Sequence, residues 1–222
     1  MASEQTVPVI AIDGPSASGK GTVAQAVAAA LGFHYLNSGA LYRTVALAAL
    51  ESGADLENEL ILRDIALNLL ADFEGESVVL GGRDVTDVVR SEAMSLTASR
   101  IAGFPRVREA LLERQRAFRQ PPGLVADGRD MGSVVFPDAT LKIFLTASPE
   151  ERAERRYKQL MNKGMHATMA TLLQDIRERD ARDSARAAAP LRQSAEAVLL
   201  DTTQMSIEEA VEQVLALYKQ AR

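Results

Sequence analysis

The segment Val9–Gly32, VIAIDGPSASGKGTVAQAVAAALG, passes from an apolar run through small residues into a stretch of helix formers. Together with Val7 and Pro8, its beginning is short and rich in β-branched residues, as a buried parallel strand is. Lys20–Leu31 predicts a helix that ends at Gly32. Between strand and helix stands G-x-x-x-x-G-K, and in this context that spacing is the pattern of a loop that binds the phosphates of a nucleotide.

The chemistry of the loop follows from its small residues and its lysine. Backbone N–H groups can close around phosphate oxygens where side chains are small, and the following helix points its positive end at the same anion. Lys20 adds a full positive charge for the terminal phosphates. We therefore expect a nucleoside triphosphate, ATP or GTP, to be bound by Gly14, Pro15, Ser16, Ala17, Ser18, Gly19, Lys20, Gly21 and Thr22.

The loop departs from the usual pattern at one place. Gly21 follows Lys20 where a serine or threonine usually stands, so the hydroxyl that normally binds Mg²⁺ comes one residue late, at Thr22. We expect Thr22 to contact a phosphate or a metal-bound water. A nucleotide-binding loop does not name a reaction. A GTPase would need Asn-Lys-x-Asp to read guanine, and the Asn-Lys in NKGM (162–165) lacks the aspartate.

The composition excludes several other kinds of site. The chain has 222 residues, 47% hydrophobic and 25% charged, as a globular protein has, and it holds no cysteine and two histidines. Thiolate nucleophiles and a histidine-rich zinc site are therefore excluded. We expect His34 to be partly buried in a strand and His166 to lie in a loop, neither with a role in the chemistry.

Charge and hydropathy bear on partners and location. A net charge of −5 argues against binding a polyanion through bulk charge, and the aromatic content of 5% argues against base-stacking surfaces. No apolar run reaches about 18 residues, and no secretory signal pattern is found. We therefore expect a cytoplasmic protein with neither a membrane nor a nucleic-acid partner. Nothing in the sequence signals an obligate interface, so we expect a monomer.

Short apolar strands alternate with helical segments along much of the chain. This predicts an α/β protein with a parallel sheet flanked by helices, of the P-loop NTPase type. After the first strand, further strands are predicted at 33–36, 123–127, 141–146 and 197–201. Helices are predicted at 38–51, with Ser38 as N-cap, and at 57–73, 92–102, 105–120 and 168–183. Two further helices are predicted to begin at a capping box of Ser148, Pro149 and Glu151 and at Ser206.

The stretch from Ser38 to Gln120 breaks the alternation. It is mostly helical, with one predicted hairpin at 77–86 whose turn holds Gly81 and Gly82. We interpret residues 38–120 as an insertion between two sheet strands that forms a subdomain on the substrate side. The whole chain, 1–222, is then a single unit whose core is 7–37 and 121–222.

One cluster of charged residues follows a predicted strand. Asp127, Arg129 and Asp130 stand in LVADGRDMG, and open parallel sheets carry their ligand residues just past the carboxyl ends of strands. Asp127 occupies the position of the acid that holds Mg²⁺ in P-loop proteins, directly or through water. Arg129 can bind phosphate, and Asp130 can accept hydrogen bonds from the amino group of a base. We therefore favour a functional cluster over three charged residues without a role in binding or catalysis.

Two other clusters leave a structural and a functional interpretation open. In NSGALYR, Ser38 and Arg43 form either an anion site for an acceptor phosphate or a capped helix with an arginine in solvent. In RERDARDSAR, Arg179, Asp183 and Arg186 stand at i, i+4 and i+7 on one helical face. They are either ligands or a surface row of ion pairs.

Taken together, the motifs resemble a known family. The segments IDGPSASGKGT, NSGALYR, ASRIAGFPRVREALLERQRAF, ADGRDMGSVVFPDA and ERDARDSARAAAPL occur in the order and spacing seen in bacterial cytidylate kinases. The resemblance extends from Val7 to about Tyr218, and the last three segments are not general features of phosphate loops. It implies transfer of the γ-phosphoryl group of ATP to CMP, and to dCMP, with Mg²⁺ as cofactor.

The resemblance also implies that the insertion 38–120 binds the nucleoside monophosphate, and it implies roles for single residues. CMP would be bound by Ser38, Tyr42, Arg43, Ser99, Arg108, Arg129, Asp130, Arg179, Asp183 and Arg186, and the catalytic residues would be Lys20, Arg129 and Arg186. Ser99, Arg108 and Asp130 would read the base. The N4 amino group of cytosine donates to a carboxylate, whereas its N3 and O2 accept from a guanidinium. Asp183 would be the ribose ligand.

A lid is expected near the predicted helix that precedes Gly164. Arg152, Arg155 and Arg156 lie at positions i, i+3 and i+4 of that helix. We interpret 156–168 as a lid that closes over ATP, with Arg155 and Arg156 as ATP ligands. Three alternatives stay open: a kinase of another small acceptor such as UMP or shikimate, a nucleotide-binding switch without transfer activity, and an RNA-binding protein. A panel of acceptors distinguishes the first two from a CMP kinase.

Overall fold

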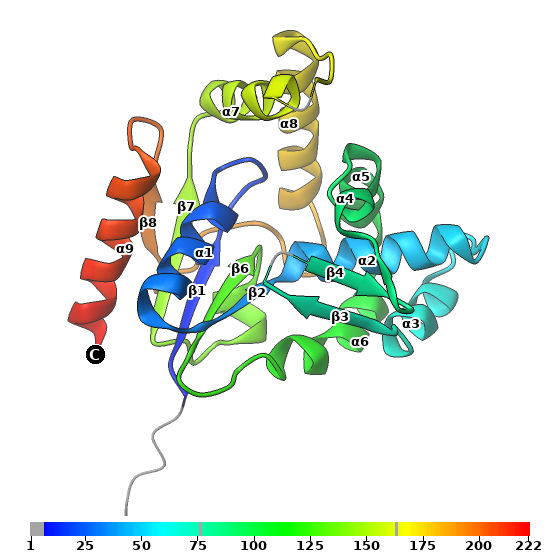
Figure 1. The fold of residues 1–222 in the computed structure, drawn as a ribbon, viewed down its shortest axis with the longest axis horizontal. Helices are drawn as coiled ribbons and strands as arrows, with labels where there is room; N and C mark the ends of the chain where they lie inside the picture. The colour runs from blue at the N-terminus through cyan, green and yellow to red at the C-terminus, as the bar shows by residue number, and fades with distance from the viewer. Residues whose placement is uncertain (1–6, 76, 163) are drawn as a thin grey trace, which may run out of the picture. The chain divides into compact units, whose positions relative to one another are not determined.

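The computed structural model describes residues 7–75, 77–162 and 164–222, which fold into two compact units (Figure 1). The core unit comprises the described residues up to Leu36 and Arg119–Arg222. The inserted unit comprises Asn37–Phe118, between the two parts of the core unit in sequence. Among the described residues, no helix combines the length and the apolar character needed to cross a bilayer.

A five-stranded parallel sheet forms the centre of the core unit. Its strands are β1 (Val9–Asp13), β2 (His34–Asn37), β6 (Leu124–Gly128), β7 (Leu141–Thr146) and β8 (Val198–Asp201), in the order β2-β6-β1-β7-β8. The central strand β1 pairs in parallel with β6 and β7, and its apolar residues from Val9 to Ile12 are fully buried. The predicted fold class and the predicted strands are confirmed.

Helices cover the sheet and lie beyond its strand ends. They are α1 (Lys20–Leu31), α7 (Pro149–Asn162), α8 (Met169–Ser184) and α9 (Ile207–Ala221). Val23 and Val27 of α1 and Val214 of α9 share a buried cluster with strand residues. Figure 1 shows α7 and α8 next to each other beyond the carboxyl ends of the strands. This end of the sheet also carries the phosphate loop.

The helix ends are set by local hydrogen bonds, and one predicted cap is wrong. Asn37 caps α2 (Ser38–Glu51), because its side chain accepts a hydrogen bond from the Ala40 N–H, so Ser38 is the first helical residue and not the N-cap. Ser148 caps α7 as predicted, but its own N–H donates to Thr203 Oγ1. The Glu151 carboxylate instead pairs with Arg155.

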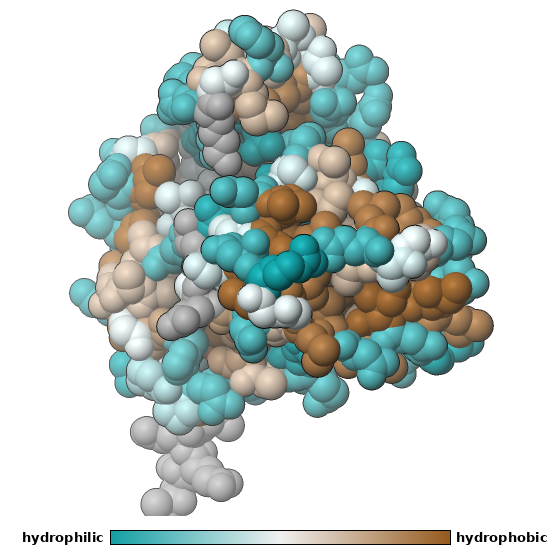
Figure 2. All heavy atoms as spheres, turned by 45° about the vertical axis from the view of Figure 1, so that its right-hand side comes forward, coloured by the Kyte–Doolittle hydropathy of each residue, from teal (hydrophilic) through white to brown (hydrophobic). Residues whose placement is uncertain are grey.

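The inserted unit combines helices with a three-stranded antiparallel sheet. Besides α2 it contains α3 (Glu59–Leu67), β3 (Ala71–Glu74), β4 (Ser77–Leu80), β5 (Arg83–Asp84), α4 (Thr86–Val89), α5 (Glu92–Ile101) and α6 (Pro105–Arg116). The predicted turn at Gly81 and Gly82 is confirmed, and both glycines have positive φ. Figure 2 shows hydrophobic side chains on the surface of this unit. Leu60 and Leu70 are among its exposed apolar residues.

Two helix predictions in the inserted unit are wrong at their ends. The helix predicted through Phe73 ends at Leu67, and residues 71–74 form a strand that pairs with β4. Ala71 and Phe73 pack on the core while Asp72 is exposed, an alternation typical of a strand. The last helix of the unit ends at Arg116 and not at Gln120. Residues 71–74 form a strand because they pair with β4, which lies outside the sequence segment that suggested a helix.

Candidate active site

The phosphate loop joins β1 to α1 in a conformation that small residues permit. A Cβ on Gly14 would lie 2.0 Å from the Leu145 carbonyl oxygen, so that position tolerates glycine alone. Ala17 (φ 57°) and Gly19 (φ 87°) have left-handed backbone conformations. The hydroxyls of Ser16 and Ser18 are buried and have no hydrogen-bond partner among the described residues. The loop therefore presents unused donors, as an anion site requires.

Lys20, at the first position of α1, is 9% exposed. Its Nζ donates to the Pro15 carbonyl oxygen at 3.1 Å and lies 3.8 Å from Asp127 Oδ1. Burial, and next the charge of Arg129, lower the pKa of Lys20 to about 7. A bound polyphosphate would favour the charged form, because it brings negative charge to this amine.

Three buried carboxylates gather where β1 and β6 end. Asp127 and Asp130 were predicted, whereas Asp13 was not. The Asp13 carboxylate accepts hydrogen bonds from the N–H groups of Met131 (2.8 Å) and Gly132 (2.9 Å). Burial raises the pKa of Asp13 to about 7, against these two bonds, which lower it. A lone acid at the end of an apolar strand, directly before Gly14, is the signal that could have identified it.

The Asp13 contacts hold a turn that the sequence did not predict. Residues Met131–Val135 form a π-helical turn, η1, and Asp130 precedes it directly. Both N–H groups bound by Asp13 belong to the first residues of η1. Asp13 therefore fixes the backbone next to Asp130, a residue that is 4% exposed.

Asp127 is a carboxylate that could hold a magnesium ion together with substrate phosphates. It lies at the carboxyl end of β6, Oδ1 is 3.8 Å from Lys20 Nζ, and Oδ2 accepts a hydrogen bond from the Tyr35 hydroxyl at 3.2 Å. Within the described part of the chain, no group of three acidic or histidine side chains could hold a metal alone. Magnesium suits such a place, because it is commonly bound by one or two carboxylates, water and substrate phosphates.

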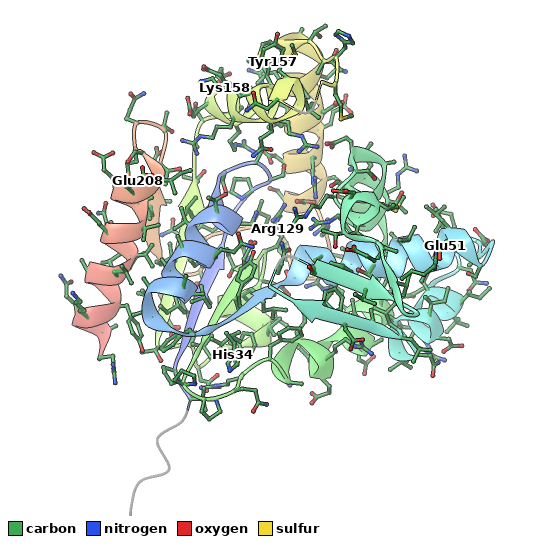
Figure 3. All side chains as sticks on the ribbon, viewed as in Figure 1. His34, Glu51, Arg129, Tyr157, Lys158 and Glu208 are labelled. Carbon is green, nitrogen blue, oxygen red and sulfur yellow. The ribbon has the colours of Figure 1, made fainter. Side chains whose placement is uncertain are left out.

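Arg129 joins the sheet to α8 through Asp183. Its Nε donates to Asp183 Oδ2 at 3.0 Å, and Arg186 Nη2 donates to Asp183 Oδ1 at 2.6 Å. Asp183 is 1% exposed; burial favours its neutral form, but Arg129, Arg186 and Arg179 hold its pKa below the usual value. Figure 3 labels Arg129 beside the strand ends. Because α8 ends at Ser184, Arg186 lies beyond the helix, and the predicted shared helical face is wrong for this residue.

Two of the predicted lid arginines bind the phosphate loop itself. Arg152 is 3% exposed; its Nη1 donates to the Ser16 carbonyl oxygen at 3.2 Å, and its guanidinium pairs with Asp180 of α8. Arg155 Nη1 donates to the Ser18 carbonyl oxygen at 2.9 Å. Arg156 Nη1 lies 3.4 Å from Gln159 on the same helix. Helix α7 therefore supports the main chain of the loop.

The predicted acceptor residues of the inserted unit lie on α2, α5 and α6. The Arg108 guanidinium lies over the Tyr42 ring, 5.8 Å from its centroid, and donates to the Ala102 carbonyl oxygen. Ser99 is buried. Arg43 turns back toward the start of α2, because its Nη1 is 3.1 Å from where a Cβ on Gly39 would lie. Tyr42 and Arg108 are thus brought together across two helices.

The two histidines lie outside this arrangement. His34 is exposed, not partly buried as predicted, and its Nε2 is 2.9 Å from the Pro121 carbonyl oxygen. Figure 3 shows it at the opposite end of the sheet from Arg129. His166 is also exposed, in the loop between α7 and α8.

Comparison with known proteins places the chain in a family. A family model described as cytidylate kinase matches residues 10–220. A cytidylate kinase of Nitrosomonas europaea is 58% identical over 219 residues, covering 99% of this chain and 98% of the relative. One of Pseudomonas aeruginosa is 57% identical over 215 residues, 94% of each chain. A crystal structure of an uncharacterized protein from Eubacterium ventriosum shares the fold, with a TM-score of 0.50 at 10% identity over 96% of this chain and 99% of that one. The chain belongs to the cytidylate kinase family.

Proposed function

We propose that the protein transfers the γ-phosphoryl group of ATP to CMP, and to dCMP, giving ADP and the cytidine diphosphate. The observation that carries this proposal is the family match along 10–220 in a chain whose phosphate loop holds a buried Lys20. The donor would lie with its phosphates in the loop Gly14–Thr22. Arg155 supports this placement, because it already holds the loop at Ser18, and Arg156 lies one residue further along α7.

Asp127 would hold Mg²⁺, directly or through water. When bound, the ion supplies positive charge that neutralises the phosphate oxygens. Lys20 would contribute its ammonium to the same oxygens, and the depressed pKa of this side chain means that the phosphates would draw a proton onto it. Arg129 and Arg186 would add two guanidinium groups for charge that develops on the transferred group.

On the acceptor side, Ser38, Arg43 and Arg129 would bind the phosphate of CMP, and Arg179, Asp183 and Arg186 its sugar and phosphate. Tyr42 and Arg108 lie against each other, which supports a shared role in placing the nucleotide. Ser99, Arg108 and Asp130 would read cytosine. Uracil carries an oxygen where cytosine carries the N4 amino group, so it would face the Asp130 carboxylate unfavourably.

The geometry supports a positioning mechanism. The acceptor is a phosphate oxygen that is already anionic, so in-line transfer needs little help from an acid or a base. The chain must hold two mutually repelling polyanions in contact. Lys20, Arg129 and Arg186 would supply that charge, and closure of residues 156–168 would exclude water that competes with CMP as the acceptor.

The test is ADP release from ATP with a panel of acceptors: CMP, dCMP, UMP and shikimate. CMP and dCMP should be converted and UMP only poorly. Conversion of another acceptor with CMP untouched would contradict the proposal. Tight ATP binding without acceptor-dependent turnover would instead indicate a nucleotide-binding switch.

Asp130→Ala separates base reading from general damage to the site. The variant should lose kcat/KM for CMP by about a hundredfold or more, because a site built on hydrogen bonds discriminates strongly when one partner is missing. Its affinity for ATP should change little. Equal losses for ATP and CMP, or no loss at all, would remove Asp130 from the base-reading role.

A further inference from the structure

Position 21 lacks the hydroxyl that usually follows the lysine of a phosphate loop. In the structure the reason is visible around Gly21. A Cβ at this position would lie 3.2 Å from Asp127 Oδ2 and 3.6 Å from the Tyr35 hydroxyl oxygen. The space that a serine or threonine side chain would enter is therefore bordered by a hydroxyl that comes from another element.

Tyr35 reaches this place from β2, the strand next to β6 in the sheet. Its ring is half-buried and packs against the apolar cluster between α1 and the sheet. Its hydroxyl donates to Asp127 Oδ2 at 3.2 Å. Residues Gly21, Tyr35 and Asp127 are separated in sequence, yet they meet at one point on the carboxyl side of the sheet.

We propose that Tyr35 is a positioning residue for Asp127, and that its hydroxyl takes the place beside Oδ2 that a serine or threonine side chain at position 21 would enter. With Oδ2 held by Tyr35, the second oxygen, Oδ1, faces Lys20 at 3.8 Å. A carboxylate that ligates a metal is usually oriented by such an outer hydrogen bond. The inference rests on the proposed role of Asp127 toward Mg²⁺, and it assigns to Tyr35 a task that a packing residue does not have.

Tyr35→Phe tests this assignment because it keeps the ring and removes the hydroxyl alone. The measurement is calorimetric binding of ATP, once with excess Mg²⁺ and once with EDTA. In Tyr35→Phe, affinity without metal should equal that of the wild type. The gain in affinity that Mg²⁺ provides should fall on the order of tenfold, as expected when an outer-shell partner is lost. An unchanged gain would overturn the proposal.

Tyr218→Phe is the matched control. Tyr218 is also a tyrosine packed in the core unit, with its ring 5.8 Å from that of Phe33, but its buried hydroxyl has no hydrogen-bond partner among the described residues. This variant should bind ATP like the wild type under both conditions. If both phenylalanine variants weaken binding equally with and without Mg²⁺, the effect is one of packing and the proposal is wrong.

A rescue variant makes the test reciprocal. Gly21→Ser alone should be impaired, because its side chain enters the space that Asp127 and Tyr35 occupy. In the Tyr35→Phe background the same serine returns a hydroxyl to Asp127, so it should recover part of the Mg²⁺-dependent gain. A double variant worse than both single variants would count against replacement of one hydroxyl by the other.

Asp127→Asn distinguishes failure of this inference from failure of the proposed function. If Asp127→Asn keeps the full Mg²⁺-dependent gain, Asp127 is not the magnesium carboxylate and the inference fails with that assignment. If Asp127→Asn loses the gain and Tyr35→Phe does not, the inference alone fails. The CMP kinase proposal is judged separately, by conversion of CMP in the acceptor panel.

Discussion

At the scale of single residues, the site buries ionisable side chains, whose charged forms lose the stabilisation that water provides. Lys20 and Asp13 are each 9% exposed, and burial moves their pKa values toward each other, both to about 7. Each shift reflects a charged form that the fold disfavours. A nucleotide bound at Lys20, as proposed, would change this balance, because phosphate oxygens favour the ammonium. Burial of this amine therefore has some cost to the stability of the free protein at pH values where the unfolded chain carries the charge.

This cost should appear as a dependence of stability on pH. The folded-state pKa of Lys20 is about 7 and its usual value is 10.5, so between these values the unfolded chain binds a proton that the folded chain lacks. The free energy of unfolding contributed by Lys20 therefore rises with pH across this window, by at most about 1.4 kcal/mol per pH unit. The wild type should gain stability relative to Lys20→Met between pH 7 and pH 9 in urea unfolding. If the difference in unfolding free energy between the wild type and Lys20→Met does not change with pH, the lowered pKa of Lys20 is contradicted.

At the scale of elements, α7 and α8 hold the phosphate loop from the side. Arg152 connects the Ser16 carbonyl oxygen of the loop with Asp180 of α8. A second pair between the same helices, Arg177 with Glu150, has both side chains about 60% exposed. Buried and exposed ion pairs differ in their contribution, because loss of one partner from a buried pair leaves a desolvated charge.

Arg152→Ala should therefore lower the free energy of unfolding by roughly 2 kcal/mol and weaken ATP binding, since Asp180 and the Ser16 carbonyl lose their partner. Arg177→Ala is the control, with an expected change within about 0.5 kcal/mol and no effect on ATP. Urea unfolding and calorimetry measure both variants. Equal effects of the two substitutions would show that the buried Arg152 contacts contribute no more to stability and ATP binding than the exposed Arg177 pair.

At the scale of the whole molecule, nucleotide binding should stabilise the folded chain by mass action. CMP at a hundredfold excess over its dissociation constant would add about 2.7 kcal/mol to the free energy of unfolding. For a chain of 222 residues this corresponds to a rise in Tm of roughly 5–10 °C. UMP at the same concentration should raise Tm much less. Thermal unfolding monitored by fluorescence measures these shifts.

Two controls make the thermal shifts specific. Asp130→Ala should lose the shift with CMP and keep the shift with ATP, because the proposed role of Asp130 is to contact the base alone. Removal of Mg²⁺ with EDTA should reduce the shift with ATP. Equal shifts with CMP and UMP in the wild type would contradict recognition of the amino group of cytosine.

Much of the fold could be predicted because its signals are local. The glycines and the lysine at 14–20 belong to one contiguous turn, and the apolar strands and their following helices carry their own periodicity. Strands 33–36, 123–127 and 141–146 were placed to within about two residues. The strand at 71–74 was missed, because its pairing with β4 outweighs a helical pattern that continues from α3.

The candidate site was predicted in part for the same reason. The order of motifs identified the family and named Lys20, Arg129 and Asp183, and the structure brings Arg129 together with Asp183 and Arg186. Asp13 and Tyr35 were missed. Their partners, the η1 turn and Asp127, lie about a hundred residues away in the chain, so no spacing rule connects them.

The sequence by itself determined the phosphate loop, the parallel α/β architecture and the family, because these depend on neighbouring residues and on the order of motifs along the chain. Only the tertiary structure decided which side chains share a hydrogen bond: Asp13 with η1, Tyr35 with Asp127, and Arg152 with both the loop and α8. Such contacts are set when strands pair and helices pack, which brings distant residues to within 3 Å or so of each other. These contacts therefore exist only in the folded protein, at the carboxyl end of the parallel sheet.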